Sequence, residues 1–398
     1  MELLKGEQVK FKHLEDSSTT KMSDEEINQK YIKGEVRIVT EQARYPLPSI
    51  VTMLDSDDYL LNPEFQRRHR WSQIQKSRLI ESFIMNVPIP PIFLYEDKYS
   101  HYEVMDGLQR LTAIYDFYTD KLVLDGLEQW PELNGKSSST LPVQIRKGID
   151  RRYLSSIILL QETAKDEFEA KKLKQLVFER INSGGVQLKP QESRNAIFNG
   201  ALNELCIKLA RNKFLCRTWN IPEPVDDEKE PSDILLANNS FREMEDVELV
   251  LRFFANRQRE ELFKSSSNFS NFLDNYLRYG NHLPKETLAE MSKVFEDTIE
   301  FMFNLLGEKA FWLYRQRNTK WNWFQRPTTA VYDSIMQMAA IYLPKKELVL
   351  KNQQLAEEKL AEFYKANYST FEGRNTNPSI LKEREAKFTE FFESLIDK

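Results

Sequence analysis

The sequence HYEVMDGLQRLTAIYDFY, residues 101–118, predicts a short strand, a glycine turn and the start of a helix. Apolar and polar side chains alternate across residues 101–104, which is the period of a half-buried strand. After Gly107 the period changes, and apolar residues recur at helical spacing from Leu108 to Tyr118. This part of the chain is therefore expected to mix strands and helices in an α+β fold.

Asp106, Gly107, Gln109 and Arg110 are placed by this pattern where the strand meets the helix. A helix N-terminus carries unpaired N–H groups and the positive end of the helix dipole, so it can hold an anion such as phosphate. A plain helix cap is the alternative, with Asp106 as the N-cap and Gln109 completing a capping box. A cap does not explain Arg110, whereas phosphate recognition uses a guanidinium. Both interpretations stay open.

The densest basic stretch of the chain is LLNPEFQRRHRW, residues 60–71. One interpretation is an anion-binding rim with Gln66 and Arg67 turned inward. The other is a solvated loop, which is the usual environment of a charge run.

Two elements are predicted between this stretch and the glycine turn. Ser72 and Gln75 have the spacing of a capping box that opens a helix. Residues 91–95 predict a strand, and the short turn at residues 96–100 would join it to the next strand as a hairpin. The hairpin would lead directly into the glycine turn.

A second polar corner follows the amphipathic pattern of residues 166–182. Asn182 precedes two glycines, and Pro190 marks a helix start whose first turns carry Glu192 and Arg194. This corner could face the Asp106 motif, or it could be an ordinary turn between two helices.

The length of 398 residues predicts two domains. Residues 1–34 are polar and are expected to form a mobile N-terminal arm. The α+β domain is then expected over residues 35–200, and a mainly α-helical domain over residues 201–398. In the helical domain, aromatic residues among bases at 311–324 predict either an aromatic core with arginines at its edge or a surface that stacks nucleobases.

Composition excludes several classes of protein. A net charge of −5 argues against a generally basic nucleic-acid-coating protein, so any contact with DNA must use a local patch. Two cysteines exclude a disulfide framework and a Cys-rich zinc module, and four scattered histidines suggest no metal site. The charged N-terminus and the lack of a long apolar run predict a cytoplasmic protein with no membrane partner.

Three segments together resemble the N-terminal domain family of GmrSD-type restriction endonucleases. They are NPEFQR at 62–67 followed by Trp71, DGLQR at 106–110, and FERIN at 178–182 continuing to Arg194. The resemblance implies a ParB/sulfiredoxin-like fold for the first domain. It also implies a site for a nucleoside triphosphate, with or without Mg2+.

The resemblance also assigns site residues. The catalytic residues would be Asp106, Gln109 and Arg110. The cofactor would be bound by Gln66, Arg67, Gly107, Asn182, Glu192 and Arg194. No metal ligands are assigned, although a carboxylate at Asp106 could hold a metal or orient water.

Two departures from the family pattern bear on function. Leu108 stands where the family motif has a glutamine, which either is structural or removes hydrolysis. The stretch Asn281-His282-Leu283-Pro284 falls one residue short of an HNH nuclease motif, so the chain is not expected to cut DNA by such a site.

Two functions follow. The first is a nucleotide-binding module of a restriction or phage-defence system, with hydrolysis of the triphosphate favoured and a separate nuclease subunit as a candidate partner. The second is a non-enzymatic DNA-binding or regulatory protein of the same fold, whose basic segments at residues 67–70 and 146–152 would contact DNA.

Overall fold

A computed structural model of the chain divides into two compact units. It describes residues 3–11, 23–32, 38–61, 68, 71–160, 173–174, 176–178, 180–181, 189–225, 228, 231–263, 268–318, 320–371 and 377–396. Residues 15–188 form the first unit, called here the α+β unit, and residues 1–14 with 189–398 form the second, called the helical unit. Residues 189–200, counted above with the first domain, therefore pack with the helical unit.

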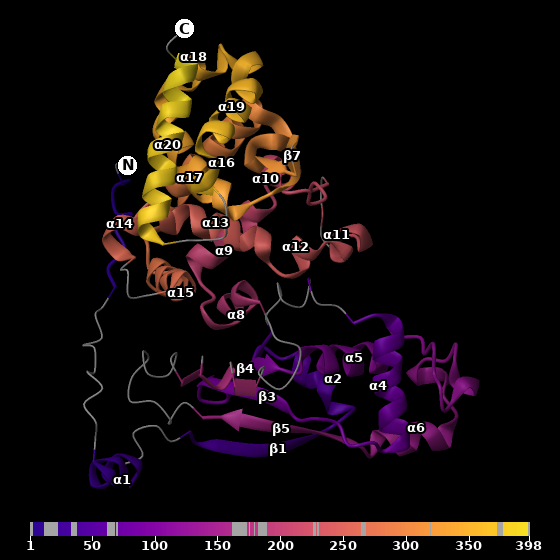
Figure 1. Cartoon of the computed structure of the whole chain (residues 1–398). Helices are drawn as coiled ribbons and strands as arrows, with labels where there is room; N and C mark the ends of the chain where they lie inside the picture. Colours follow the sequence, from indigo (N-terminus) through magenta and orange to yellow (C-terminus); the bar gives the residue numbers. More distant parts are fainter. Residues whose placement is uncertain are drawn as a thin grey trace. The chain divides into compact units, whose positions relative to one another are not determined.

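The α+β unit contains a five-stranded sheet in the order β1-β5-β3-β4-β2. Strands β1 and β5 pair antiparallel, as do β3 and β4, whereas β3–β5 and β2–β4 are parallel. Figure 1 shows β1, β5, β3 and β4 side by side in this order. The elements are α1 (Asp24–Ile32), β1 (Thr40–Pro46), α2 (Ser49–Leu54), β2 (Tyr59–Leu60), α4 (Gln73–Met85), β3 (Ile92–Lys98), β4 (His101–Asp106), α5 (Leu108–Tyr118), η1 (Pro131–Leu133), η2 (Ser138–Thr140), α6 (Val143–Asp150) and β5 (Tyr153–Leu159).

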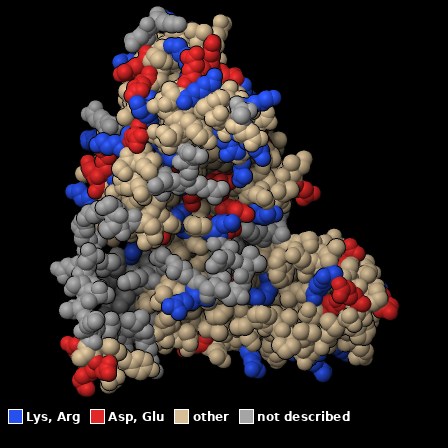
Figure 2. Space-filling model, viewed as in Figure 1, with Lys and Arg blue, Asp and Glu red and all other residues tan. Residues whose placement is uncertain are grey.

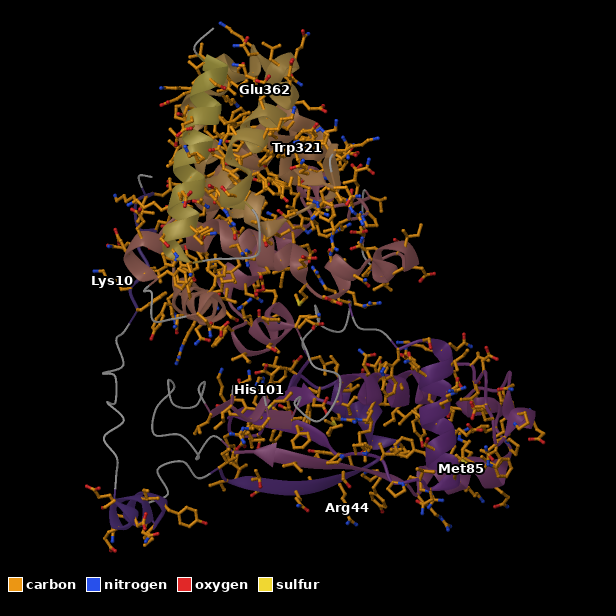
Figure 3. All side chains as sticks on the ribbon, viewed as in Figure 1. Lys10, Arg44, Met85, His101, Trp321 and Glu362 are labelled. Carbon is orange, nitrogen blue, oxygen red and sulfur yellow. The ribbon has the colours of Figure 1, made fainter. Side chains whose placement is uncertain are left out.

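The predicted order of strand, glycine turn and helix is confirmed by β4 and α5. Leu111 and Ile114 of α5 are fully buried together with Ile80 of α4, as the apolar stripes require. The Ser72–Gln75 capping box is also confirmed, with both of its reciprocal hydrogen bonds present. These helices hold the N-terminus of α5 in place beside the sheet. His101, at the first residue of β4, is labelled in Figure 3.

The helical unit is built mainly from helices that pack around buried aromatic residues. Its elements are α8 (Pro190–Ile197), α9 (Ala201–Ala210), α10 (Lys213–Thr218), α11 (Asp233–Ala237), α12 (Asn239–Arg242), α13 (Glu245–Asn256), α14 (Arg259–Leu262), α15 (Phe269–Gly280), α16 (Lys285–Leu306), η4 (Gly307–Phe311), β6 (Trp312–Arg317), β7 (Lys320–Pro327), α17 (Thr329–Tyr342), η5 (Leu343–Lys345), α18 (Lys346–Leu350), α19 (Gln353–Phe371) and α20 (Pro378–Ile396). None of the helices in the described ranges is both long enough and apolar enough to cross a membrane.

One segment of the helical unit is not helical. The aromatic and basic segment forms an antiparallel hairpin, β6–β7. Tyr314 and Trp323 are cross-strand partners with ring centroids 5.0 Å apart, and Trp321 also stacks on Tyr314, at 5.8 Å. Aromatic cross-strand pairs of this kind stabilise a hairpin. Trp321 is labelled in Figure 3, and its ring also contacts Tyr368 of α19.

Residues 3–11, which fall within the segment expected to be an arm, pack against the helical unit. The Glu7 side chain is fully buried and pairs with the buried Arg257 guanidinium, with Nη2 2.8 Å from Oε2. The Gln258 side chain donates to the Glu7 carbonyl oxygen and accepts from the Val9 N–H, both at 2.8 Å. This segment is therefore part of the core of the helical unit.

We predict that Glu7→Ala lowers the free energy of unfolding by about 3 kcal/mol, because it leaves a buried guanidinium without its carboxylate. Chemical denaturation followed by far-UV circular dichroism measures this change. The matched control is Lys10→Ala, at an exposed position of the same segment, with an expected change under about 0.5 kcal/mol. Equal stability of the two variants would contradict the assignment.

Candidate functional site

Gly107 forms the corner between β4 and α5. It is the N-cap of α5, with a φ of 97° in the left-handed region. A Cβ at this position would lie 2.3 Å from Cγ2 of Ile92, so the corner accepts only glycine without rearrangement. The prediction that Asp106 is the N-cap is wrong: Asp106 is the last residue of β4, and its carboxylate pairs with Arg110 instead. Because glycine has no side chain, α5 starts without a side-chain cap.

Arg110 is held at this corner by two acceptors. Its Nη2 donates to Asp106 Oδ2 at 2.6 Å and to the Pro91 carbonyl oxygen at 3.3 Å. The Arg110 side chain is 15% exposed and that of Asp106 is 39% exposed, so the corner meets solvent at the carboxylate. The Nε of Arg110 is buried and has no hydrogen-bond partner in the described part of the chain.

Gln109 joins the corner to the end of the basic stretch. Its Oε1 accepts a hydrogen bond from the Trp71 N–H at 3.0 Å, and this donor fixes which way the amide is turned. The Gln109 Nε2 is then buried, and none of the described residues offers it an acceptor. Burial of an unpaired donor costs about 1–3 kcal/mol. The corner therefore contains two buried donors that lack an acceptor among the described residues, Gln109 Nε2 and Arg110 Nε. They lie at the N-terminus of α5, which has no side-chain cap.

Several predicted site residues cannot be placed at this corner. Gln66, Arg67 and Asn182 lie outside the described residues. Within residues 62–70 the structure describes Arg68, which is buried rather than solvated. Because Trp71 contacts Gln109, the basic stretch ends at the corner.

Glu192 and Arg194 both belong to α8 of the helical unit. Glu192 Oε2 accepts from the Lys189 N–H at 2.5 Å and so closes the N-terminus of α8. Arg194 is buried, and its Nε, Nη1 and Nη2 donate to Asp274, Glu248 and Ser270 respectively. Glu192 therefore caps α8, and Arg194 packs α8 onto its neighbours.

Glu248 connects Arg194 to a second buried arginine. Its two oxygens accept from Arg194 at 2.7 Å and from Arg252 at 3.1 Å, and Arg252 also pairs with the buried Asp333. Burial alone would raise the pKa of the Glu248 carboxyl, but the Arg252 and Arg194 guanidiniums outweigh this effect and hold the pKa below its usual range. Glu248 therefore stays ionised and joins α8, α13 and α17.

Two contacts at the site were missed by sequence reasoning. The Pro91 carbonyl and Ile92 come from the start of β3, which lies beside β4 in the sheet. The proline pair at 90–91 marked the start of a strand but gave no sign that its backbone would reach Arg110.

Asn281, considered above for a nuclease motif, has an observed packing role: its Oδ1 accepts from the Leu202 and Asn203 N–H groups at 3.0 and 3.1 Å.

No group of three or more histidine, cysteine, aspartate and glutamate side chains positioned to hold a metal occurs among the described residues. Asp106 thus offers a single carboxylate, which suits Mg2+ only when phosphate and water oxygens complete its coordination.

The site thus belongs to a mixed α+β domain in which a strand, a left-handed glycine and a helix carry the polar motif. Residues 45–199 match the family model of the GmrSD restriction endonuclease, N-terminal domain. Over these residues the chain is similar to the N-terminal domain of that family. No curated protein and no solved structure matched the chain.

We predict that Gly107→Ala destabilises the α+β unit by about 3 kcal/mol or more, because it adds both left-handed strain and a clash with Ile92. Gly135→Ala is the matched control: Gly135 also has a positive φ, of 81°, but a Cβ there meets nothing within 4 Å. It should cost about 1 kcal/mol from strain alone. Differential scanning calorimetry of the two variants separates the terms, and equal losses would contradict the steric role of Ile92.

Proposed function

We propose that the corner formed by Asp106, Gly107, Gln109 and Arg110 binds the phosphates of a nucleoside triphosphate and supports its hydrolysis. The chain would act in the cytoplasm as a component of a restriction or phage-defence system, with the cut in DNA made by a separate nuclease subunit. The match of residues 45–199 to the GmrSD N-terminal domain supports the setting. A ParB/sulfiredoxin-like assignment of the α+β unit is part of the same proposal.

One observation carries this proposal: the Nε2 of Gln109 and the Nε of Arg110 are buried donors without an acceptor among the residues that the structure describes. Buried polar groups nearly always make a hydrogen bond, so buried donors without one suggest that a ligand supplies the acceptor. Phosphate oxygens are strong acceptors and suit a guanidinium in particular. The first-turn N–H groups of α5 and its dipole add to the attraction.

Each residue at the corner then has a task. Asp106 holds the Arg110 guanidinium in one orientation through the 2.6 Å contact to Nη2, which leaves Nε for a phosphate oxygen. Arg110 stabilises the charge that develops on the transferred phosphoryl group. Bound Mg2+ would supply charge neutralisation at the phosphates, with the solvent-exposed Asp106 carboxylate as its protein ligand.

The burial of Leu108 favours a structural reason for the leucine that stands where the family motif has a glutamine. Its side chain is 6% exposed and belongs to the apolar core of the α+β unit. A side chain in that position contributes packing, while the donors come from its neighbours Gln109 and Arg110. Leucine at this position therefore leaves the groups proposed to hydrolyse the triphosphate in place.

Arg110→Ala is expected to weaken triphosphate binding at least tenfold and to slow phosphate release at least about 100-fold, since an arginine at a phosphoryl group contributes this much or more. The four common nucleoside triphosphates are each tested by isothermal titration calorimetry and by a phosphate-release assay with Mg2+.

The matched control for this experiment is Arg78→Ala in α4 of the same unit. Arg78 is exposed and pairs with Glu128 at the surface, so its loss should change neither measurement. Melting curves of both variants report whether the fold is kept. The proposal fails if the unaltered chain neither binds nor hydrolyses any triphosphate, or if Arg110→Ala releases phosphate at the rate of the unaltered chain.

A DNA contact is a second candidate function, favoured by the surface of α6. Arg146, Lys147 and Arg151 are exposed around its C-terminal half and make no ion pair with the described residues. Elsewhere the charges are mixed: Figure 2 shows acidic and basic side chains interspersed over the visible face of the helical unit. A local patch of this kind is what a chain of net charge −5 requires for nucleic acid.

If α6 contacts DNA, replacing these three cations with alanine should weaken binding and make the slope of log K against log salt shallower, by about 0.9 for each phosphate that is no longer neutralised. Fluorescence anisotropy with a labelled duplex over a salt series measures the slope. A control variant removes three exposed cations elsewhere in the unit, Arg78, Lys98 and Lys121. Identical slopes for the two variants would exclude α6 as the contact.

A further inference from the structure

The helical unit contains a cavity of about 1070 Å³ that the proposed function does not use. It is open to solvent and is lined by the N-terminal ends of α8, α13 and α17, by residues at and next to α11 and α12, and by the hairpin β6–β7. Every residue that lines it lies between residues 189 and 371, so the cavity belongs to this unit alone. Its size is at the upper end of the range for small-molecule sites.

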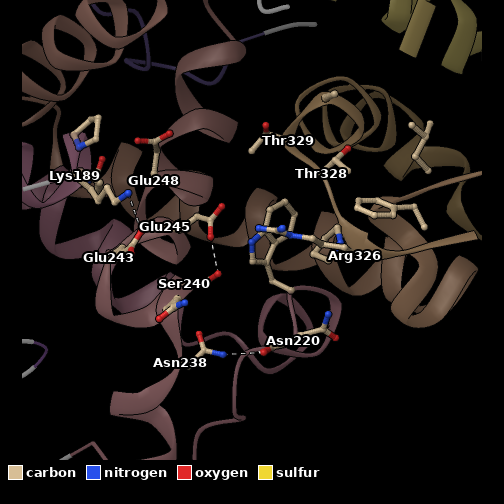
Figure 4. Close-up of a pocket in the computed structure, with 18 of the residues that line it drawn as sticks. Lys189, Asn220, Asn238, Ser240, Glu243, Glu245, Glu248, Arg326, Thr328 and Thr329 are labelled. Carbon is tan, nitrogen blue, oxygen red and sulfur yellow. Dashed lines mark hydrogen bonds and ion pairs between the residues drawn. The ribbon is translucent and has the colours of Figure 1, made fainter. Parts of the chain in front are cut away.

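The two sides of the cavity differ in charge. Figure 4 shows Glu243, Glu245 and Glu248 on one side and Arg326, Thr328 and Thr329 on the other. The second side also receives Arg315, whose guanidinium lies 3.8 Å from the centroid of the Phe324 ring. A ligand that fits both sides must be anionic at one end and a hydrogen-bond donor at the other.

The cations of the basic side are available. Neither Arg315 nor Arg326 makes an ion pair with a carboxylate in the described part of the chain. Thr328 caps α17 by accepting from the Val331 N–H, so the N–H groups of Thr329 and Ala330 still face outward from this 14-residue helix. Two guanidiniums and a helix N-terminus together attract a phosphate.

The carboxylates of the acidic side are largely neutralised. Glu248 pairs with Arg194 and Arg252, and Glu243 has Lys189 at 3.4 Å. Glu245 is exposed and accepts a hydrogen bond from Ser240 at 2.5 Å. These oxygens can accept from hydroxyl or amino groups without imposing a large negative charge on the cavity.

A buried side chain independently points to a ligand. Gln191 lines the cavity and is 1% exposed, and its Oε1 accepts from Arg194 Nη1 at 3.2 Å. That contact fixes the orientation of the amide and leaves Nε2 without an acceptor within the described ranges. A buried donor without an acceptor is costly, and because Gln191 is among the residues that line the cavity, a ligand bound there is a candidate acceptor once the amide turns toward it.

We propose that this cavity binds a nucleoside monophosphate, with the phosphate between Arg315, Arg326 and the N-terminus of α17. The sugar hydroxyls and base amino groups face Glu245 and its neighbours, and Gln191 Nε2 donates to an acceptor on the ligand. The apolar lining from Trp219, Leu313 and Phe324 accommodates the ring. The ligand is either a free nucleotide or a nucleotide within a single strand of nucleic acid.

The test uses the full-length chain carrying Arg110→Ala, so that the proposed triphosphate site does not contribute. Adenosine and cytidine 5′-monophosphate, inorganic phosphate and a short single-stranded oligonucleotide are each titrated by isothermal titration calorimetry. Arg326→Ala and Gln191→Glu, which keeps the acceptor for Arg194 and removes the donor, should each weaken the monophosphates about tenfold. The control Arg317→Ala removes an exposed cation of β6 outside the cavity and should change affinity less than about twofold.

The relative affinity of the monophosphates and the oligonucleotide identifies the source of the nucleotide. Three results would overturn the proposal: no binding of any monophosphate or of the oligonucleotide, inorganic phosphate bound as tightly as the nucleotides, or equal losses from Arg326→Ala and Arg317→Ala. Arg326 is exposed, so its replacement leaves the fold intact and a negative result has meaning. Phosphate release by the chain without Arg110→Ala is independent of these results.

Discussion

The contact between the Gly107 backbone and Ile92 is the constraint from which the site follows. Between β4 and α5 the chain passes close to the Ile92 side chain of β3. A residue with a Cβ at position 107 would clash with Ile92 and would also be strained in the left-handed conformation. A glycine N-cap has no side chain to satisfy the first N–H groups of the helix. The same packing requirement that closes the α+β core therefore leaves a helix N-terminus open to an outside acceptor.

The ion pair between Asp106 and Arg110 serves to orient the guanidinium more than to stabilise the fold. Its carboxylate is 39% exposed, and partly exposed pairs one helical turn apart contribute only a few tenths of a kcal/mol. A guanidinium has five donors in a fixed plane, so fastening Nη2 to Asp106 determines where Nε points. Pairing also reduces the net charge at the corner, so attraction for an anion depends on the dipole of α5 as well as on Arg110.

Local sequence patterns predicted part of this arrangement. They did not predict which strands, far apart in the sequence, pair with one another. The change of period at Gly107 gave β4 and α5, and Ser72 and Gln75 gave the start of α4. The N-cap at Asp106 was wrong because an arginine four residues later competes for the same carboxylate, and spacing alone does not rank the two partners. Strand β5 was not predicted, because its pattern has meaning only beside strands more than 50 residues away. The hairpin β6–β7 was hidden by the helical periodicity around it, although alternating tryptophans at 321 and 323 were an available signal for a strand.

The arginines of the two units show why residue type alone does not locate a site. Arg110 and Arg194 were both predicted to serve the nucleotide, and both are largely buried. All three nitrogens of Arg194 have acceptors within the helical unit, so its donors are already used in holding α8, α13 and α15 together. Arg110 keeps a buried Nε for which the described residues provide no acceptor, beside a solvent-exposed carboxylate. The unsatisfied donor, rather than the charge, distinguishes the arginine that can bind a ligand from the one that holds the fold.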